Sequence, residues 1–408
     1  MNEMFDVVII GAGPSGSVAA SLLAKHNVSV LMLEKLEFPR FIIGESLLPQ
    51  SMEFLEKADL LQSVVEHGFQ FKNGAAFGCA DQSSLIDFRL KFSEGWGTTY
   101  QVQRAPFDHL LAKKAATKGI DVRYNHEVMD IDLSQDISRL KVKDAEGNES
   151  EIECKFILDA SGYGRVLPRL LDLERPSSFP VRNALFTHMK DQLCTKKFDR
   201  NKILITVHPE QHDIWYWLIP FSDGTSSVGV VVRPEVLDKY KGDNSEKLWT
   251  LLREAKELGA LLDDAEEIHP VGQLSGYSCD VSNLCSDKYA LLGNAGEFLD
   301  PVFSSGVTIA LKSADLVVPP LLKQLNGEEV DWEKEYAKPL KIGVTCFKTF
   351  VESWYEGSLQ KIIFNPPEGD NSIRDMVISI LAGYAWDEKN PFVTQPKKYL
   401  EMVAAQCP

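Results

Sequence analysis

The chain has 408 residues, 44% of them hydrophobic and 25% charged, which is the composition of an ordinary globular protein with a large core. Its formal net charge of −16 argues against nucleic acid as a partner and against an anionic membrane surface. Seven cysteines, an odd number without a Cys-x-x-Cys pair, indicate reduced thiols and a cytoplasmic protein.

Two apolar stretches resemble targeting or membrane segments only superficially. Residues 7–24 follow Asp6 and are rich in Gly, Pro and Ser, which is not the pattern of a signal peptide. Residues 316–322 are too few to span a bilayer, and we expect Pro319-Pro320 to break any helix there. We therefore expect no membrane association.

The N-terminus has the pattern of a dinucleotide-binding unit. A buried strand at Phe5–Ile10 leads into the turn Gly11-Ala12-Gly13-Pro14-Ser15-Gly16 and a helix to about His26. A second strand at Val28–Leu33 ends in Glu34. Both NAD and FAD proteins use this strand–turn–helix–strand unit.

Each position of this unit has a physical role. Gly11 permits the tight turn, Gly13 lets the backbone approach a pyrophosphate, and Gly16 lets helix and strand pack closely. Glu34 can accept hydrogen bonds from both ribose hydroxyls and would repel a 2′-phosphate. The neighbouring positions that we assign to the same cofactor site are Pro14, Ser15, Lys35 and Arg40, whose guanidinium can pair with a pyrophosphate.

Further elements of an α/β protein follow. Residues 101–108 lead into a helix, Asp121–Tyr124 is a strand, and Glu127-Val128 comes just beyond it. Phe156–Asp159 is another buried strand, and it ends in the small residues Ala160-Ser161-Gly162.

A β-rich region follows, and we expect it to form a mixed sheet that roofs the cofactor and makes a substrate wall. Its predicted strands are Val181–His188, Lys202–Val207, Ile214–Pro220 and Ser226–Val232, with a helical stretch at Ser245–Leu262. Trp215 and Trp217 share one strand face and Tyr216 lies on the other. For the indoles alone, core packing is the more common role.

A second small-residue turn lies far along the chain. The strand Tyr289–Leu292 ends in Gly293-Asn294-Ala295, and after Asp300-Pro301 we expect a helix from about Ser305 to Val318. The backbone amides of Ser304-Ser305-Gly306 can form an anion-binding nest at that helix start.

The C-terminal region is predicted to be helical from Trp332 to Ile363, with aromatic residues spaced to pack against the body: Phe347, Phe350, Trp354 and Tyr355. The tail after Asn365 is rich in Pro and charge. Its Tyr384, Trp386 and Phe392 either cover a substrate pocket or merely dock.

This order of elements resembles the FAD-dependent hydroxylases of the p-hydroxybenzoate hydroxylase type. The resemblance implies that Arg104 lies along the flavin and that residues 160–162 and 293–295 close over it. Where the family has Gly-Asp-Ala, this chain has Gly293-Asn294-Ala295, so the hydrogen-bonding reach is kept and the charge is lost. The other implied FAD contacts are Ser46, Val128, Ala160, Ser161, Gly162, Pro301, Ser305, Gly306 and Val307.

Three segments resemble, more narrowly, the flavin-dependent halogenases that act on phenols and pyrroles. Residues 38–49 match their F-P-R-F-x-I-G-E-S-L-L-P segment, residues 300–307 their D-P-V-F-S-S-G-V, and residues 215–220 their W-x-W-x-I-P. Tryptophan halogenases have an acid in the 300–307 loop, whereas Ser304 and Ser305 stand here as in the phenol and pyrrole types.

The resemblance also implies catalytic roles. Lys72, in a segment similar to F-x-x-K-x-G-A-x-F, would meet hypohalous acid diffusing from the flavin, although an exposed strand lysine is the alternative. Ser304 and Ser305 would hold a halide ion beside the flavin, and Glu45 joins the catalytic set. The rings that would keep organic substrate off the flavin are Trp215, Trp217 and Pro220.

We therefore predict an α/β fold: a Rossmann-like FAD-binding domain of the p-hydroxybenzoate hydroxylase/glutathione reductase type, a mixed β-sheet substrate domain and a helical C-terminal region. The predicted FAD domain comprises residues 1–77, 100–180 and 275–330, the substrate domain 78–99 and 181–274, and the C-terminal region 331–408.

Function is predicted as oxidation of a halide by reduced FAD and O₂, with halogenation of a small or carrier-tethered aromatic. No second G-x-G-x-x-G motif occurs, so a separate flavin reductase is expected to supply reduced FAD. No metal-ligand cluster is expected. The alternatives are an FAD-dependent reductase of the geranylgeranyl reductase type, acting on carbon–carbon bonds, and a flavin carrier without enzymatic activity.

Overall fold

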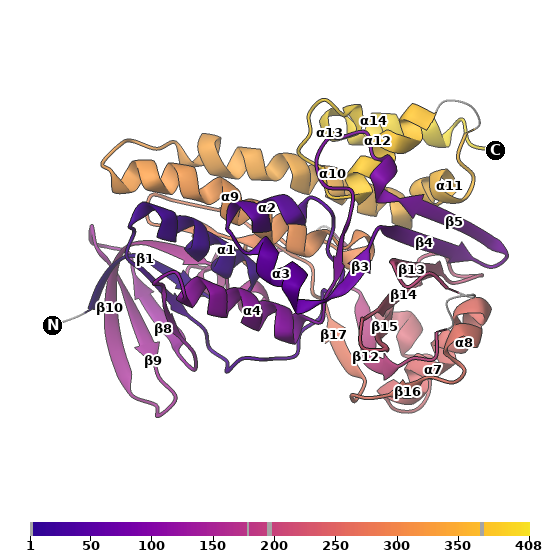
Figure 1. Ribbon diagram of the computed structural model, residues 1–408, viewed down its shortest axis with the longest axis horizontal. Helices are drawn as coiled ribbons and strands as arrows, with labels where there is room; N and C mark the ends of the chain where they lie inside the picture. Colours follow the sequence, from indigo (N-terminus) through magenta and orange to yellow (C-terminus); the bar gives the residue numbers. More distant parts are fainter. Residues whose placement is uncertain (1–2, 178, 194–197, 368–370) are drawn as a thin grey trace.

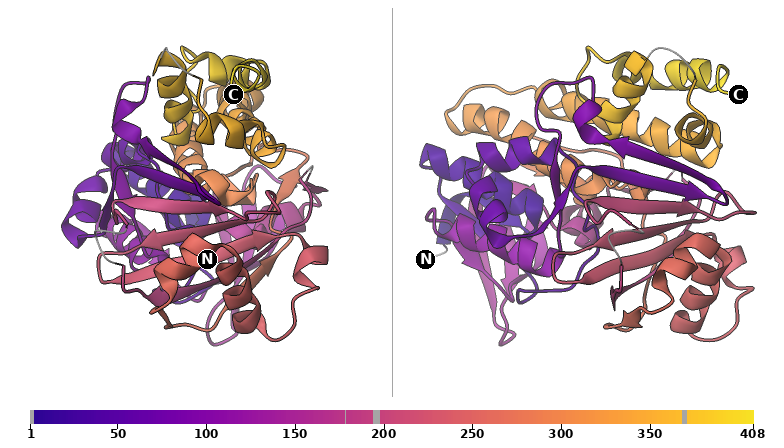
Figure 2. Two further views of the ribbon diagram at one scale, coloured as in Figure 1. Left: turned by 90° about the vertical axis from the view of Figure 1, so that its right-hand side faces the viewer. Right: turned by 45° about the vertical axis from the view of Figure 1, so that its right-hand side comes forward.

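A computed structural model describes residues 3–177, 179–193, 198–367 and 371–408 of the chain. Two β-sheets lie side by side along the long axis of the molecule, the first at the left and the second at the right of Figure 1. Helices cover the upper side of both, and the C-terminal helices gather above the second sheet (Figures 1 and 2).

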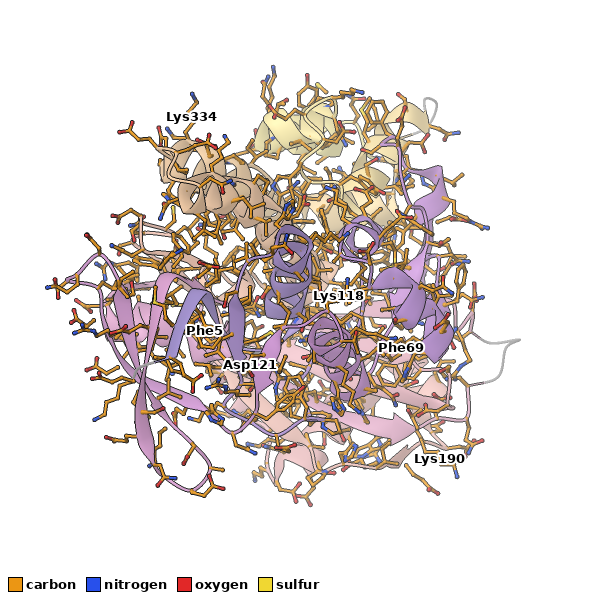
Figure 3. All side chains as sticks on the ribbon, turned by 60° about the vertical axis from the view of Figure 1, so that its left-hand side comes forward. Phe5, Phe69, Lys118, Asp121, Lys190 and Lys334 are labelled. Atoms are coloured by element: carbon orange, nitrogen blue, oxygen red, sulfur yellow. The ribbon has the colours of Figure 1, made fainter. Side chains whose placement is uncertain are left out.

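The first sheet has the parallel core of a dinucleotide-binding fold. Its strand order is β7-β2-β1-β10-β9-β8, with β19 paired to β10. The parallel strands are β1 (Glu3–Ile10), β2 (Val30–Leu33), β7 (Asp121–Arg123), β10 (Glu149–Asp159) and β19 (Tyr289–Leu291). The antiparallel strands β8 (Glu127–Asp132) and β9 (Ser138–Lys143) complete it. In Figure 3, Phe5 marks β1, Asp121 marks β7 and Lys118 follows helix α4 (Arg104–Ala116).

The strands of this parallel core are fully apolar where they are central, because both faces are covered. Val7, Val8 and Ile9 of β1 are completely buried, as the continuous apolar run predicts. Helices α1 (Pro14–Leu23) and α9 (Ser305–Leu325) pack against each other over the sheet. Smaller helices nearby are α2 (Ser51–Lys57), α3 (Leu61–His67) and α5 (Val166–Leu170).

The second sheet is mixed, as predicted. Its order is β16-β12-β15-β14-β13-β4-β5, with β17 paired to β12. The strands are β4 (Gly74–Cys79), β5 (Gln82–Asp87), β12 (Asn183–Lys190), β13 (Lys202–Val207), β14 (Trp215–Pro220), β15 (Thr225–Val232), β16 (Glu266–Glu267) and β17 (Gly272–Ser275). Helices α6 (Pro234–Leu237), α7 (Asn244–Glu254) and α8 (Lys256–Leu262) follow β15, and α7 and α8 cover one face with a separate apolar cluster.

The boundary between the two parts differs slightly from the predicted position after residue 77. The whole of β4 belongs to the second sheet, so that sheet begins at Gly74. Just before it, β3 (Gln70–Lys72) pairs with β6 (Thr99–Gln101) in a separate two-stranded ladder. A second such ladder joins β11 (Glu174–Pro176) and β18 (Cys279–Val281).

Helix α9 corrects the prediction that Pro319-Pro320 would break a helix. It runs through both prolines to Leu325, seven residues beyond the predicted end at Val318. Proline removes a backbone hydrogen bond and clashes with the preceding turn, at a cost of about 3 kcal/mol in a helix interior. Burial of Val317, Val318 and Leu321 outweighs that cost.

Helix α9 also bears on the question of membrane association. Among the described helices it alone is long and apolar enough to cross a membrane, and 61% of its most apolar stretch is buried inside the protein. Burial of this kind is typical of the core helix of a soluble protein.

The C-terminal region is helical, including the tail. It comprises the π-helical turn Glu333–Ala337, α10 (Lys338–Tyr355), α11 (Ser358–Phe364), α12 (Asn371–Leu381), α13 (Pro391–Thr394) and α14 (Pro396–Ala404). Trp386 packs on Gly343 of α10 and donates to the backbone oxygen of Pro339 at 3.1 Å. Of the two roles left open for the tail aromatics, docking against α10 and its neighbours is the one the structure shows.

Replacing Gly343 by alanine tests this docking. Alanine normally stabilises a helix relative to glycine by about 1 kcal/mol. Here the added Cβ would lie 2.2 Å from the indole of Trp386, so we expect Gly343→Ala to lower the unfolding free energy by about 1–3 kcal/mol. Denaturant titration would measure the change, with the exposed Thr345→Ala on the same helix as control. A raised stability would contradict the packing described.

Candidate active site

A cavity of about 670 Å³ lies between the two sheets and reaches the start of α9. Its size is that of a small-molecule or cofactor site. Most of the residues predicted for the cofactor, the halide or the shielding wall line it: Gly11, Gly13, Pro14, Ser15, Glu34, Lys35, Arg40, Glu45, Ser46, Arg104, Val128, Ala160, Ser161, Gly162, Trp215, Trp217, Asn294, Pro301, Ser304, Gly306 and Val307. The predicted residues that do not line it are Gly16, Lys72, Pro220, Gly293 and Ser305.

The glycine-rich turn is shaped by two close backbone contacts. Gly11 has a φ of +102°, and a Cβ there would lie 2.5 Å from the carbonyl oxygen of Ala160. A Cβ on Gly16 would lie 2.1 Å from the carbonyl oxygen of Gly11, so Gly16 serves packing of helix against strand, as expected, without reaching the cavity. Gly13 is less crowded, because a Cβ added there would have only Arg40 Nη2 within 4 Å, at 3.7 Å.

Glu34 is held rigidly at the end of β2. Its Oε2 accepts a hydrogen bond from the backbone N–H of Ala12 at 3.0 Å, and its Oε1 accepts one from Leu36 at 3.1 Å. Arg40 Nε lies 3.9 Å from Oε1. A negative charge fixed in this place can bind ribose hydroxyls and would repel a 2′-phosphate. Lys35 forms a more exposed ion pair, in which its Nζ lies 2.6 Å from Oε1 of Glu127.

Arg104 forms a buried, bidentate ion pair and not an ion pair on the protein surface. Its Nε and Nη2 donate to the two carboxylate oxygens of Asp108 at 2.7 and 2.9 Å. Arg40 donates to the same carboxylate at 3.3 Å, and Arg104 also donates to the carbonyl of Ile43 at 3.1 Å. Asp108 therefore orients both arginines toward the cavity.

The second small-residue turn brings the start of α9 to the cavity. Ser304 adopts the left-handed conformation (φ 58°, ψ 25°) immediately before α9, and Gly306 and Val307 line the cavity. Gly293 packs against α9, because a Cβ there would lie 2.7 Å from Ala310 Cβ. Ser305 is buried and its hydroxyl does not line the cavity. The first turn of α9 therefore presents mainly backbone N–H groups to the cavity.

One wall of the cavity is the face of β14 that carries the indoles. Strand alternation places Trp215, Trp217 and Ile219 on the cavity side, and Tyr216 in the apolar cluster under α7 and α8. Pro220 lies on the same strand face as Tyr216 and does not line the cavity. Ile219 lines the cavity at the position where Pro220 was expected. The Trp217 indole donates to Ser227 Oγ at 3.1 Å.

Lys72 is completely buried, contrary to the alternative of an exposed strand lysine. Its Nζ donates to Ser46 Oγ at 2.6 Å and to the carbonyl oxygen of Leu47 at 2.8 Å, and it lies 5.2 Å from the centre of the Phe88 ring. Burial lowers the pKa of Lys72 to about 7. Because Ser46 lines the cavity, one hydrogen bond separates this amine from the cofactor space.

Glu45 faces the cavity from the same segment as Ser46. Its Oε1 lies 2.8 Å from Nε2 of His188, and its Oε2 is buried without a hydrogen-bond partner among the described residues. An unpartnered buried carboxylate oxygen in a cavity wall is suited to accept a hydrogen bond from a bound molecule.

Several residues that shape the site were not predicted from the sequence. Asp108 lies in the segment that carries Arg104, and the four-residue spacing on one helix was the available signal. No sequence pattern indicated His188 or Tyr277. His188 lies on the second sheet and Tyr277 follows it, and folding alone brings them to the site.

The lowered pKa of Lys72 predicts a pH-dependent cost to stability. Below about pH 7 the amine is charged in both states, so the cost of burying the charge is fully present. Between pH 7 and the ordinary value of 10.5 only the unfolded chain holds the proton, and the cost falls by about 1.4 kcal/mol per pH unit. Lys72→Met should therefore be more stable than the wild type at pH 7, by a margin that shrinks toward pH 10.

Urea unfolding at several pH values would measure that margin. Lys202→Met is the matched control, since Lys202 begins β13, which pairs with the β4 strand that follows Lys72, and its side chain is 13% exposed. A margin that is constant or that grows with pH would contradict burial of a titrating amine.

Comparison with known proteins identifies the family of this chain and several relatives. Residues 4–334 match the family described as FAD binding domain. A chlorinase of Pseudomonas fluorescens, named for 1H-pyrrole-2-carbonyl-[peptidyl-carrier protein], is 28% identical over 98% of this chain and 93% of its own length.

Two solved structures have the same fold. A flavoprotein/dehydrogenase from Cytophaga hutchinsonii is 42% identical, with a TM-score of 0.95 over 99% of this chain and 98% of that one. The myxobacterial chondrochloren halogenase CndH is 26% identical, with a TM-score of 0.79 over 99% and 97%. The protein is thus an FAD-dependent oxidoreductase that belongs to the FAD binding domain family, and it is similar in sequence and fold to flavin-dependent halogenases.

Proposed function

We propose that the protein oxidises a halide ion with reduced FAD and O₂ and halogenates an electron-rich aromatic ring. The observation that supports this best is the place of Lys72, a buried amine one hydrogen bond from the FAD cavity and behind its lining residue Ser46. In the balanced reaction, reduced FAD, O₂, halide and a proton give FAD, hypohalous acid and water. Hypohalous acid then replaces a ring hydrogen by halogen and releases a second water.

The cavity fits FAD by its own residues. Gly13 leaves room for a pyrophosphate beside Arg40, and Glu34 stands where a ribose is expected. Arg104 and Asn294 line the cavity toward the ring system, and the unpartnered Glu45 Oε2 can accept a hydrogen bond there. When bound, reduced FAD supplies the electrons that activate O₂ for oxidation of the halide.

The first turn of α9 is the proposed halide site. Backbone N–H groups at a helix start have no intrahelical acceptors, and the helix dipole favours an anion there. Ser304 and Gly306 bring this turn to the cavity. The same amides can hold the flavin pyrimidine, so the two roles are compatible.

Lys72 and the indole wall have complementary proposed roles. Trp215 and Trp217 fill the sheet side of the cavity and keep an aromatic substrate from the flavin. Lys72 receives the oxidised halogen: with a pKa of about 7 the amine is partly neutral at neutral pH, so it can donate a hydrogen bond to hypohalous acid or accept the halogen.

We infer further that a separate reductase supplies reduced FAD and that the protein acts in the cytoplasm, where reduced flavin and thiols coexist. The sequence supports the first point, because it holds a single G-x-G-x-x-G motif. The substrate is an aromatic of the phenol or pyrrole class. The carrier-bound pyrrole for which the Pseudomonas relative is named supports testing such a substrate as well as free compounds.

The proposal is tested with reduced FAD, O₂ and bromide or chloride, and a panel of free and carrier-bound phenols and pyrroles read out by mass spectrometry. We expect a halide-dependent mass gain that falls at least about 100-fold in Lys72→Met, the size typical for loss of a proton-transferring group. Oxidation of reduced FAD should continue in that variant, and Lys202→Met should keep the wild-type yield.

Two results would redirect the assignment. Anaerobic oxidation of reduced FAD by an unsaturated lipid, without dependence on halide, would indicate the carbon–carbon reductase. Very slow oxidation of FAD with every probe would indicate a flavin carrier.

A further inference from the structure

A cluster of polar side chains behind the indole wall joins the FAD-binding part, the second sheet and the C-terminal region. Its members are Arg182, Trp215, Tyr277, Asp300 and Tyr355. Asp300 is 2% exposed and precedes the turn that starts α9, whereas Tyr355 ends α10 and does not line the cavity.

The contacts form a continuous chain from the wall to the loop. The Trp215 indole N–H donates to the hydroxyl oxygen of Tyr355 at 2.8 Å. The Tyr355 hydroxyl interacts in turn with the carboxyl of Asp300 and opposes the rise in pKa that burial causes in that carboxyl, and Tyr277 donates to the same carboxyl at 3.1 Å. Asp300 also accepts from the backbone N–H of Val302, within the turn before α9.

The direction of this chain is fixed by the chemistry of its members. An indole N–H can only donate, so the Tyr355 oxygen must accept from Trp215. The single hydroxyl proton of Tyr355 is then free to go to Asp300, where the carboxylate accepts it. The Arg182 guanidinium, 3.6 Å from the centre of the Tyr355 ring, holds the ring in place and offsets the buried negative charge.

We propose that Tyr355 is a positioning residue whose hydroxyl ties the Trp215 indole to the Asp300 carboxyl. The indole wall and the first turn of α9 are thereby kept at a set separation across the FAD cavity. The C-terminal helical region thus shapes the reaction compartment without contacting its contents. The effect on halide use rests on the proposed function, whereas the tie itself does not.

Tyr355→Phe removes one oxygen and leaves the ring on Arg182. In FAD-loaded, ¹⁵N-labelled protein we expect the Trp215 indole signal, identified by its absence in Trp215→Phe, to shift and to exchange with solvent about tenfold faster, the equivalent of one hydrogen bond. The Trp217 indole, bonded to Ser227, should be unchanged and serves as internal control.

The tie also predicts coupling between positions that do not touch. Trp215→Phe should shift the backbone amide signals of Ser304 and Gly306, and this shift should vanish when the substitution is made in Tyr355→Phe. Because Trp215→Phe breaks the same bond from the other side, it tests the proposal even if Tyr355→Phe does not fold. An unchanged Trp215 indole in Tyr355→Phe, or unchanged loop amides in Trp215→Phe, would overturn it.

Turnover provides a readout that a merely stabilising tyrosine would not change. In Tyr355→Phe we expect the bromide KM to rise several-fold with little change in kcat, and more hypohalous acid to escape per FAD oxidised. Tyr384→Phe is the control, since that tyrosine donates to the Trp96 carbonyl at 2.9 Å, away from the cavity. Equal KM values in wild type and Tyr355→Phe would refute the effect on halide use.

If no variant shows halide-dependent product, the proposed function fails. The indole and backbone amide measurements would still test whether Tyr355 connects Trp215 to Asp300.

Discussion

The approach of two loops at the carboxyl ends of β1 and β10 is the constraint on which the site depends. Gly11 and Ala160 are so close that a single added carbon would lie 2.5 Å from a carbonyl oxygen. That contact sets where α1 begins and therefore where its free N–H groups point. Chain segments far apart in sequence, ending β10 and β19, reach the same edge because parallel strands end together there.

The second sheet and the C-terminal helices turn this edge into an enclosed compartment. Strand β14 presents Trp215 and Trp217 to the cavity, while α9 closes the far side with its first turn. The buried ion pair of Arg104 with Asp108 fixes the charge at the cavity wall without filling the cavity. Lys72 lies outside this compartment. Its amine donates to Ser46 and to Leu47, and of these two residues only Ser46 lines the cavity. Under the proposed function, this arrangement separates the place of halide oxidation from the place where the aromatic ring is modified.

The parts that the sequence predicted well are those governed by local backbone demands. Gly11, Gly16 and Glu34 are in their expected places because the turn, the packing and the strand end are properties of neighbouring residues. The sequence could not predict the burial of Lys72, since Phe88 and β6 meet it only after folding. It was also wrong about Pro319-Pro320, because burial of α9 in the core outweighs the helix-breaking tendency of proline. Pro220 was placed by its motif, and strand alternation places it on the other face.

The position of Lys72 at the end of β3 has a mechanical consequence. Asn73 alone separates it from Gly74, where β4 enters the second sheet, while its amine is bonded to Ser46 and Leu47 of the cofactor-binding part. The backbone of this lysine belongs to the β3–β6 ladder, and its amine is anchored to the 46–47 segment, which is itself joined to β6 through the backbone pair of Ser46 with Gln101. The two hydrogen bonds of the amine thus complete one unit made of β3, β6 and the 46–47 segment, so Lys72 and Ser46 would move together if the second sheet shifted against the first.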